Sequence, residues 1–464
     1  MADLRIGSRR FPSRWWLPLA FSAAAVLLGA PLPGAEGPAL EKITHLIVIY
    51  QENWSFDGLY GRFPGADGLA TSGETVRQTT KDGTPYTALP PPLDTSRKPP
   101  GVDARFPANL PVRPFDLAQF VRPEERTGDL VHRFYQEQHQ IHGGLMDHFL
   151  AWSDNPGLVL SVYDATDLPE GRLARQYTMA DRFFHAAFGG SFLNHFWFVC
   201  ACTPVWPNAP ASEIISLDSQ GFLVKDGSVT SDGYAVNTAF SVNPPYPASA
   251  SDPARRLPLQ TMPTIGDRLS EAGISWAWYS GGWNDAVAGH PDPLFQYHHQ
   301  VFNYFARYAD GMPDRTHLKD IEDFRTALTT GTLPAVAFVK PLGADNEHPG
   351  YAELRRGQQY VADLVAAVQR SPAWADTAII ITYDENGGRW DHVAPPTGDR
   401  WGPGTRVPTI VVSPFAKKGF VDHTVYDTLS ILKLIETRWN LAPLGTRDVA
   451  ANPLLNAFDF SQRP

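Results

Sequence analysis

The sequence has little cysteine, no surplus of positive charge and only one long apolar run. Its two cysteines, Cys200 and Cys202, are separated by a single residue in a chain of 464. Such a pair excludes a disulfide-rich scaffold and a cysteine-based zinc site, and we expect a disulfide across so short a gap to require strained backbone. Stability must therefore come from a packed core, which 43% hydrophobic residues can supply.

Acidic residues outnumber basic residues by 49 to 39, which gives a formal net charge of −10. An acidic chain is repelled by the phosphate backbone of DNA and RNA, so the composition argues against a nucleic-acid partner. With 38 glycines and 42 prolines, the chain also stays below the share that is typical of low-complexity sequences.

The long apolar run covers residues 15–29, after four arginines and before small residues and prolines that reach Ala35. This pattern predicts a signal peptide over residues 1–35 and export to the periplasm or the medium. A membrane anchor is the alternative, although the run is short for a span. The paired arginines of Ser8–Phe11 are similar to those of a twin-arginine signal. Cleavage near Ala35 would remove four Arg and one Asp, which changes the net charge from −10 to −13.

Short apolar runs bounded by turn residues alternate with amphipathic stretches along the chain. The runs predict buried parallel strands at 45–50, 275–279, 336–339, 378–383 and 407–412. Helices are predicted at 264–272, 358–370 and 428–439. This alternation favours a layered α/β fold, with a mostly parallel central sheet flanked by helices. We expect residues 36–464 to form a single catalytic domain.

Two stretches interrupt the alternation: about 64–114 is rich in Pro, Gly, Thr and Asp, and about 203–263 mixes Pro-rich coil with hairpin-like pieces at KDGS and SDGY. We interpret both as long loop insertions at the surface. Loops of this length in a compact domain commonly cover a site, so a lid is a reasonable hypothesis.

Polar groups follow two of the predicted strands. Glu52 and Asn53 follow the first, and Asp384 and Glu385 follow the fourth. Either pair alone is more simply explained as turn residues. Together, carboxylate and amide oxygens at the carboxyl ends of neighbouring strands are typical ligands of a divalent cation.

Ser191 follows two glycines and precedes a predicted helix over residues 192–202. A hydroxyl at a helix N-terminus lies where free amides favour a phosphate, and a neighbouring cation would make it a nucleophile. The alternative is an ordinary Ser N-cap. Asn194 and His195 follow one turn later, on or beside the same helix face.

Several histidines can complete such a site, although any one of them can equally be an ordinary core or surface residue. A cluster of imidazoles would donate hydrogen bonds to a phosphate and protonate the leaving oxygen, which favours mildly acidic pH. The candidates are His132, His139, His142, His298, His299 and His348.

Six segments, in order, resemble the bacterial phosphoesterase family of acid phosphatase A and the non-specific phospholipases C. They are QENWSFDGLYG, GGLMDHF, AAFGGSFLNH, EHPGY, TYDENGGRWDHVAPP and RVPTIVVSPFAKKGFVDHT, all within residues 43–439. The resemblance implies a core similar to alkaline phosphatase and one divalent metal ion, which Ca, Mg, Mn or Fe would each fit. By resemblance, the metal ligands are Glu52, Asn53, Ser191, Asp384 and Glu385.

The resemblance also implies Ser191 as nucleophile, phosphate binding by Asn194 and His195, and catalytic roles for His132, His298, His299 and His348. Asp391 and His392 are expected to support the site or to face the phosphate rather than to bind a second metal. The segment GGSFLNH and the end of the chain about 25 residues after Trp439 are more similar to the acid phosphatase branch.

The sequence therefore predicts an exported acid phosphatase that hydrolyses small phosphomonoesters through a phosphoserine intermediate. One alternative is a phospholipase C that acts on phospholipid headgroups, in which case membrane lipid is a partner. Another is an exported protein that binds phosphate esters or metal without turnover. The oligomeric state stays open.

Overall fold

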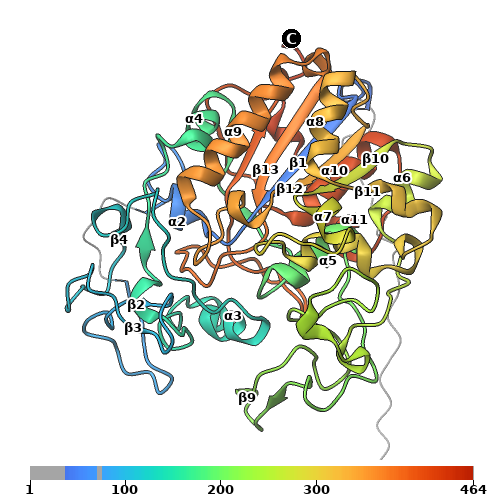
Figure 1. Cartoon of the computed structure of the whole chain (residues 1–464). Coiled ribbons are helices and arrows are strands. Elements are labelled where there is room, and N and C mark those ends of the chain that lie inside the picture. The colour runs from blue at the N-terminus through green and yellow to red at the C-terminus, as the bar shows by residue number, and fades with distance from the viewer. Residues whose placement is uncertain (1–36, 70–75, 463–464) are drawn as a thin grey trace, which may run out of the picture. The chain divides into compact units, whose positions relative to one another are not determined.

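The computed structural model describes residues 37–69 and 76–462, and the predicted signal peptide at 1–35 lies outside these residues. Within them, one central sheet has the strand order β11-β10-β12-β1-β13-β14-β6-β15. Figure 1 labels its five strands from β11 to β13. Its strands are β1 (His45–Gln51), β6 (Thr178–Ala180), β10 (Trp276–Ser280), β11 (Leu318–Lys319), β12 (Val336–Lys340), β13 (Thr377–Tyr383), β14 (Thr409–Val412) and β15 (Phe420–Asp422).

The five strands β11, β10, β12, β1 and β13 run parallel, as the sequence predicts for most of the sheet. Strand β14 is antiparallel to β13, so the expectation of a parallel strand at 407–412 was wrong. The described residues that join these two strands, 384–408, contain no helix. A parallel neighbour needs a crossover connection, whereas an antiparallel one does not. An apolar run in the sequence predicts that a strand is buried, but it does not predict whether the strand is parallel or antiparallel to its neighbour.

Helices cover both faces of this sheet, which confirms the layered α/β fold. They are α1 (Gly37–Leu40), α2 (Phe56–Tyr60), α3 (Phe134–Ile141), α4 (Pro169–Gln176), α5 (Ser191–Cys200), α6 (Ile265–Glu271), α7 (Trp283–Val287), α8 (Ile321–Thr330), α9 (Leu354–Arg370), α10 (Thr428–Trp439) and α11 (Thr446–Ala450). The predicted helices at 264–272, 358–370 and 428–439 correspond to α6, α9 and α10, with α9 starting four residues early.

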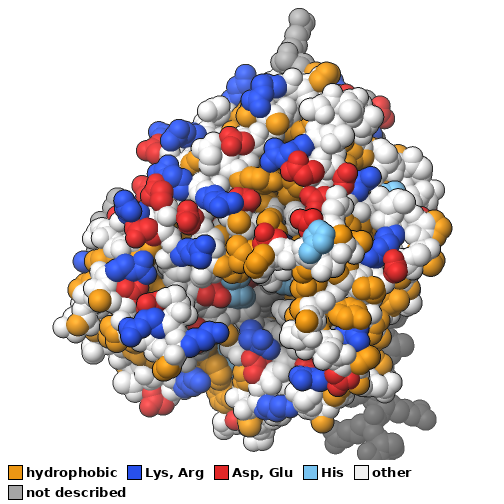
Figure 2. All heavy atoms as spheres, in the orientation of Figure 1, with side chains coloured by type: hydrophobic (Ala, Val, Ile, Leu, Met, Phe, Trp, Pro, Cys, Tyr) orange, Lys and Arg blue, Asp and Glu red, His pale blue; other side chains and the backbone are white. Residues whose placement is uncertain are grey.

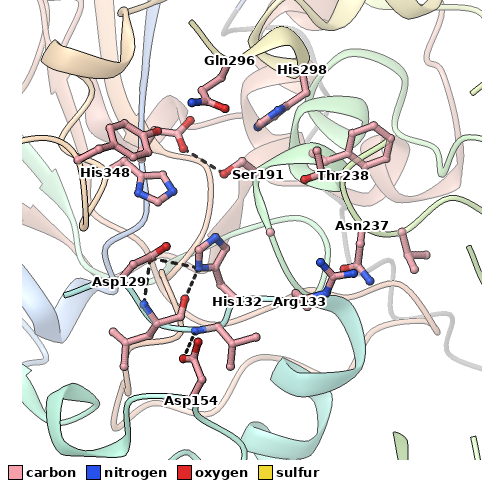
Figure 3. A pocket seen from close by; sticks show the side chains of 17 residues that line it. Asp129, His132, Arg133, Asp154, Ser191, Asn237, Thr238, Gln296, His298 and His348 are labelled. Atoms are coloured by element: carbon pink, nitrogen blue, oxygen red, sulfur yellow. Dashed lines mark hydrogen bonds and ion pairs between the residues drawn. The ribbon is translucent and has the colours of Figure 1, made fainter. Parts of the chain in front are cut away.

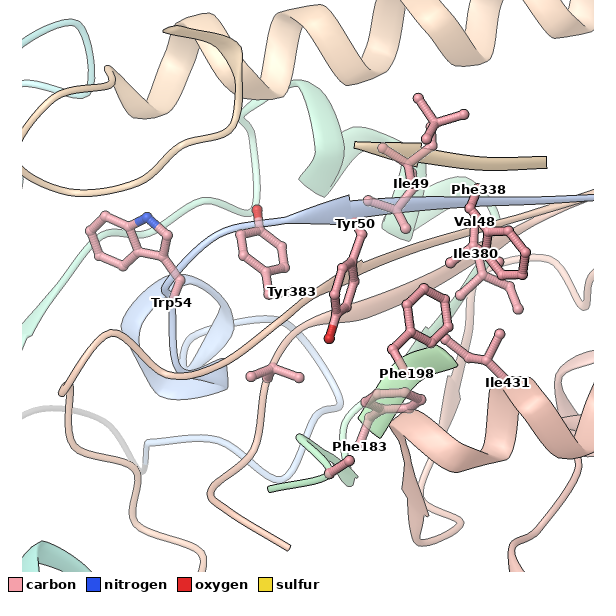
Figure 4. Packing of buried hydrophobic residues seen from close by; sticks show 14 of the residues in the cluster. Val48, Ile49, Tyr50, Trp54, Phe183, Phe198, Phe338, Ile380, Tyr383 and Ile431 are labelled. Carbon is pink, nitrogen blue, oxygen red and sulfur yellow. The ribbon is translucent and has the colours of Figure 1, made fainter. Parts of the chain in front are cut away.

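The core lies where helices α5 and α10 pack against the middle of the sheet. Figure 4 shows Phe198 of α5 and Ile431 of α10 on one side of β1, next to Tyr50. Phe198 and Tyr50 have ring centroids 4.7 Å apart, and both are fully buried. Burial of such apolar side chains supplies most of the driving force for folding and fixes α5 against the sheet.

The described residues of the two insertions contain short strand pairs and, at Ala248–Ala250 and Pro253–Arg255, two short 3-10 helices, but no α-helix. Strand β2 (Leu93–Asp94) pairs with β3 (Gly101–Val102), and β8 (Ser216–Leu217) pairs with β9 (Leu223–Lys225). The remaining short pairs are β4 (Phe115–Asp116) with β5 (Ser161–Val162), and β7 (Phe183–Phe184) with β16 (Tyr426–Asp427). No helix among the described residues has the length and apolar character that a membrane span requires.

Cys200 and Cys202 form a disulfide at the end of α5. The residue between them, Ala201, has a φ of +47°, in the left-handed region that non-glycine residues rarely adopt. The short spacing therefore does not prevent the bond, and its backbone cost falls on Ala201.

Candidate active site

The register of the parallel strands brings the predicted metal ligands together. In the pairing of β1 with β13, Gln51 lies opposite Tyr383, so the next residues, Glu52 and Asp384, leave the sheet side by side. Strand β12, the other neighbour of β1, ends at Lys340. In α/β sheets this edge, beyond the carboxyl ends of the strands, is where ligands bind.

The two loops that follow these strands fit closely against each other. Asn53 has a φ of +63°, and its backbone N–H donates to Asp384 Oδ1 over 3.2 Å. Gly387 has a φ of +62°, and a Cβ at this position would lie 2.2 Å from the carbonyl oxygen of Asn53. Only glycine fits there, which explains the glycine that follows the acidic residues.

Ser191 is the first residue of α5, and Gly190, not Ser191, is the N-cap. The Ser191 hydroxyl donates to Glu52 Oε2 over 3.1 Å (Figure 3). It also lies 3.3 Å from Asn53 Oδ1. Gly189 before it has a φ of +84°, and a Cβ there would lie 2.4 Å from the Phe134 nitrogen. The predicted nucleophile and the predicted metal ligands therefore meet at one point.

Asn194 is fully buried, and its side chain faces the loop before the helix. Its Nδ2 donates to the carbonyl oxygens of Ala187, Gly189 and Gly190, and its Oδ1 accepts from the Ala187 N–H. These bonds use its polar atoms to hold the loop that presents Ser191. The structure thus places Asn194 behind the site, whereas the sequence predicts direct contact with phosphate.

His195 and His299 also lie behind the site, on the far side of Glu52. His195 Nδ1 donates to the Ser191 carbonyl oxygen over 2.7 Å, and its ring stacks on that of His299 with centroids 5.2 Å apart. His299 Nε2 lies 2.9 Å from Glu52 Oε1. Within the described residues, Glu52, His195 and His299 form one group of potential metal ligands.

Lys340 is a buried residue of the site that the sequence did not predict. Its ammonium contacts Glu52 Oε1 and lies 3.9 Å from Asp384 Oδ2. The available signal was its place at the end of a predicted buried strand, the same signal that identified Glu52 and Asp384. A lysine after an apolar run is more often solvated, so it was not selected.

A cavity of about 320 Å³ opens over Ser191. Figure 2 shows the surface hollowed near the middle of this face, with histidine side chains inside the hollow. His132, His298 and His348 line the cavity together with Ser191, and Asn53 Nδ2 donates to the Nε2 atoms of His348 and His132 over 2.9 and 3.2 Å. Further lining residues that the sequence did not predict are Asp129, Arg133, Asp154, Asn237, Thr238, Gln296 and Tyr351.

The electrostatics of the cavity floor are dominated by burial. Burial, and then the charge of Glu52, raises the pKa of Asp384 well above its usual range, and burial and Asp384 do the same for Glu385. Burial also opposes ionisation of Glu52, but the charges of His299 and Lys340 hold its pKa well below the usual value. The floor therefore carries acidic groups that lack enough positive charge nearby.

We name Glu52, Asp384, Glu385 and Lys340 the strand-end cluster. When all three carboxylates are ionised they face one ammonium, and the excess of two negative charges equals the charge of one divalent cation. Asp384 Oδ2 and Glu385 Oε1 are buried and have no hydrogen-bond partner among the described residues. With the oxygen of Asn53 beside them, these atoms are the donors that a hard or intermediate divalent cation prefers. The residues present fit such an ion.

A second buried acidic cluster, the Arg406 cluster, consists of Asp57, Asp391, His392 and Arg406. Arg406 Nε donates to Asp391 Oδ1 over 2.9 Å and its Nη2 to Asp57 Oδ1 over 3.1 Å. His392 Nδ1 donates to Asp57 Oδ2 over 2.7 Å. Since the guanidinium occupies the space between the two carboxylates, this group of potential ligands is an ion-pair network, and neither Asp391 nor His392 lines the cavity over Ser191.

A family model described as the Phosphoesterase family matches residues 43–442. Phospholipase C B from Mycobacterium tuberculosis is 26% identical to the chain, over 96% of this chain and 85% of that protein. The non-hemolytic phospholipase C of Burkholderia pseudomallei is also 26% identical, over 91% of this chain and 60% of its own length. A solved structure of a protein in the alkaline phosphatase superfamily from Vibrio parahaemolyticus is 11% identical, with a TM-score of 0.33, over 71% of this chain and 73% of that one.

Proposed function

The chain belongs to the phosphoesterase family, and from this premise we propose that it hydrolyses phosphate esters with Ser191 as nucleophile. The observation that carries the proposal is the meeting of the Ser191 hydroxyl with Glu52 and Asn53 at the floor of the cavity, over 3.1 and 3.3 Å. A nucleophile and a helix N-terminus that line one cavity, with buried carboxylates next to them, are the parts that phosphoryl transfer needs.

In this proposal Ser191 Oγ attacks phosphorus, the bond from phosphorus to the leaving oxygen breaks, and a phosphoserine forms, which water then hydrolyses. The hydrogen bond to Glu52 orients Oγ toward the cavity. The free amides at the start of α5 face the developing charge on the phosphoryl oxygens. A divalent cation held by Glu52, Asn53, Asp384 and Glu385 supplies, when bound, Lewis-acid stabilisation and a lower pKa for the Ser191 hydroxyl.

His132, His298 and His348 surround the position that the phosphate would occupy. Burial, and then the neighbouring His299, lowers the pKa of His298 well below its usual value, and burial lowers that of His348. A neutral His298 can donate one N–H to a phosphoryl oxygen. The N–H groups of His132 and His348 are already used, because their Nδ1 atoms donate to the carbonyl oxygens of Leu130 and Pro349 and their Nε2 atoms accept from Asn53. An arriving phosphate adds negative charge, which raises the proton affinity of His298 and prepares it to protonate the leaving oxygen.

Phospholipid headgroup esters are the first candidate substrates, because the relatives named above are phospholipases C. This favours the alternative reading of the sequence over the acid phosphatase reading. The second candidate is a small phosphomonoester, which three imidazoles and a helix N-terminus around one hydroxyl also suit. In both cases the chain acts on the phosphate group, and export through residues 1–35 stays a prediction.

The test compares purified wild-type protein with Ser191→Ala on phosphatidylcholine and on p-nitrophenyl phosphate. A phospholipase C releases phosphocholine from the first substrate, and a phosphomonoesterase releases inorganic phosphate from the second. We expect Ser191→Ala to reduce the rate at least about 10³-fold without a change in melting temperature.

The control is Ser371→Ala, at the end of α9, where the hydroxyl only donates to the Val368 carbonyl oxygen. Its activity should equal that of the wild type. Turnover by Ser191→Ala within tenfold of the wild type would exclude Ser191 as nucleophile. No turnover by the wild type, with retained binding of phosphate esters, would favour the non-catalytic alternative.

A further inference from the structure

The hairpin of β8 and β9 exposes apolar side chains beside the cavity. Leu217, Phe222 and Val224 are 38%, 39% and 69% exposed, within eight residues of one another. In Figure 1 the hairpin lies at the lower end of the view, away from the central sheet. Exposed large apolar residues that gather on one projecting loop usually mark an interaction site, whereas single ones need no explanation.

The hairpin presents these side chains on a well-defined turn. Asp218 Oδ1 accepts from the N–H groups of Gln220 and Phe222, each over 2.9 Å. The Phe222 ring lies 5.3 Å from that of His139 and 6.0 Å from that of Trp152, between centroids. Leu223 packs toward the core opposite Leu217, and because side chains alternate along a strand, Val224 points to the other face of β9. Phe222 directly precedes β9.

The base of the hairpin is bonded to the mouth of the cavity. Asp226, directly after β9, pairs with Arg133 over 2.6 Å, and Arg133 also donates to the Gly227 carbonyl oxygen over 2.7 Å. Arg133 and Asn237 line the cavity, and Asn237 Nδ2 donates to the same carbonyl oxygen over 2.8 Å. A surface bound by the hairpin would therefore lie close to the entrance of the active site.

The exposed area of the hairpin and the charges around it indicate which kind of partner it would bind. The exposed area of three side chains is well below the roughly 800 Å² per partner that a stable protein interface buries. The charged groups nearby do not form a cationic patch, since Asp218 and Asp226 accompany Lys225, whose ammonium donates to the backbone of Ala211 and Ser212. An apolar tip without surplus positive charge suits insertion into an uncharged or zwitterionic lipid surface better than electrostatic attachment to an anionic one.

We propose that the β8–β9 hairpin inserts Phe222 and Val224 into the surface of a zwitterionic membrane and holds the cavity mouth against the lipid headgroups. This inference rests on the proposed phosphoester hydrolysis and names lipid as the substrate class. Insertion removes apolar side chains from water, so it does not depend on salt.

The experiment measures binding of the full chain to phosphatidylcholine vesicles by flotation, in the Ser191→Ala background so that lipid is not consumed. We expect Phe222→Ser with Val224→Ser to weaken partitioning at least about tenfold, and Val224→Trp to strengthen it several-fold. The matched control is Met312→Ser with Val449→Ser, which changes residues of 45% and 52% exposure outside the hairpin and should change partitioning less than about twofold.

Activity measurements with Ser191 intact separate this inference from the proposed function. The double hairpin variant should hydrolyse a soluble, monomeric short-chain phosphatidylcholine at the wild-type rate and vesicles at least about tenfold more slowly. Equal vesicle binding by wild type, the double variant and Val224→Trp would overturn the hairpin proposal, even if hydrolysis is normal. Self-association that the double variant abolishes would overturn it in favour of a second copy of the chain. If hairpin-dependent binding occurs without any hydrolysis, the docking role stands and the proposed function fails.

Discussion

The strand-end cluster and the Arg406 cluster are both buried and acidic, but they differ in how their charges are matched. In the Arg406 cluster, the guanidinium donates to Asp57 and to Asp391, and His392 donates to Asp57. In the strand-end cluster, Lys340 is the neighbouring cation, and Asp384 Oδ2 and Glu385 Oε1 lack hydrogen-bond partners among the described residues. Burial of acidic residues alone does not distinguish a site; unmatched charge does.

The difference has a physical basis. A buried carboxylate costs several kcal/mol unless a counter-charge and hydrogen bonds replace its water. A protein retains unmatched buried carboxylates when a ligand that is not part of the chain completes them. We therefore expect that neutralising one member of the strand-end cluster lowers activity and leaves stability unchanged or higher. Neutralising one member of the Arg406 cluster should lower stability and leave activity nearly unchanged.

The largest effect is expected for Asp384→Asn. Loss of this carboxylate removes a proposed cation ligand, so activity should fall at least about 10³-fold, which corresponds to about 4 kcal/mol of transition-state stabilisation. Without added cation, the variant should be as stable as wild type or more stable, because a buried acid whose ionised form lacks a counter-charge is replaced by a neutral amide. Steady-state kinetics and thermal unfolding in chelator measure the two effects. Activity within tenfold of wild type would show that Asp384 is not part of the catalytic centre.

The next largest effect is expected for a variant of the Arg406 cluster, which should lose stability and keep activity. Arg406→Met leaves Asp57 and Asp391 buried without their shared cation, which should reduce the free energy of unfolding by about 3–5 kcal/mol. The folded fraction should keep activity within about tenfold of wild type, since the guanidinium does not line the cavity. Urea unfolding and activity per folded molecule provide the measurements. An unchanged unfolding free energy would remove the distinction between the clusters.

The sequence could predict the fold and the approach of Glu52 to Asp384, because both follow from the positions of the buried strands. Glu52 and Asp384 were identified from apolar runs that end in acidic residues, and the register of β1 and β13 then brings them together without further information. The antiparallel direction of β14 could not be predicted, since an apolar run carries no sign of strand direction.

Side-chain orientation was the other part that the sequence could not supply. Asn194 follows Ser191 on the same helix, yet it bonds to the preceding loop. His299 follows a cavity-lining histidine, yet it lies behind Glu52. Lys340 was missed because its role depends on two carboxylates from other strands, and this environment exists only after folding.

Cation removal should affect only the strand-end cluster. If the ion binds the folded protein and is present at 100 times its Kd, it stabilises the fold by about 2.7 kcal/mol, and chelation should lower the melting temperature accordingly. Addition of Ca²⁺, Mg²⁺, Mn²⁺ or Fe²⁺ should restore the melting temperature, and the most effective ion identifies the preferred metal. Asp384→Asn should show little response, and Asp391→Asn, in the other cluster, should respond like wild type. If chelator does not change the melting temperature of the wild type, the strand-end cluster does not bind a stabilising cation.

The smallest effect is a pH dependence that belongs to the Arg406 cluster. Burial alone would lower the pKa of His392, but its hydrogen bond to Asp57 and the charges of Asp57 and Asp391 raise it above the usual value. A raised pKa in the folded state means that the imidazolium stabilises the fold fully below its unfolded pKa of about 6.5 and that this contribution is lost as pH rises through the folded value.

His392→Gln keeps a hydrogen-bond donor but cannot take a charge, so the difference in unfolding free energy from wild type should be on the order of 1 kcal/mol at pH 5.5 and smaller at pH 9. Urea unfolding at both pH values, with constant ionic strength, measures it. A difference that stays constant or grows with pH would mean that His392 is neutral in the folded protein, and Arg406 alone would then match both carboxylates.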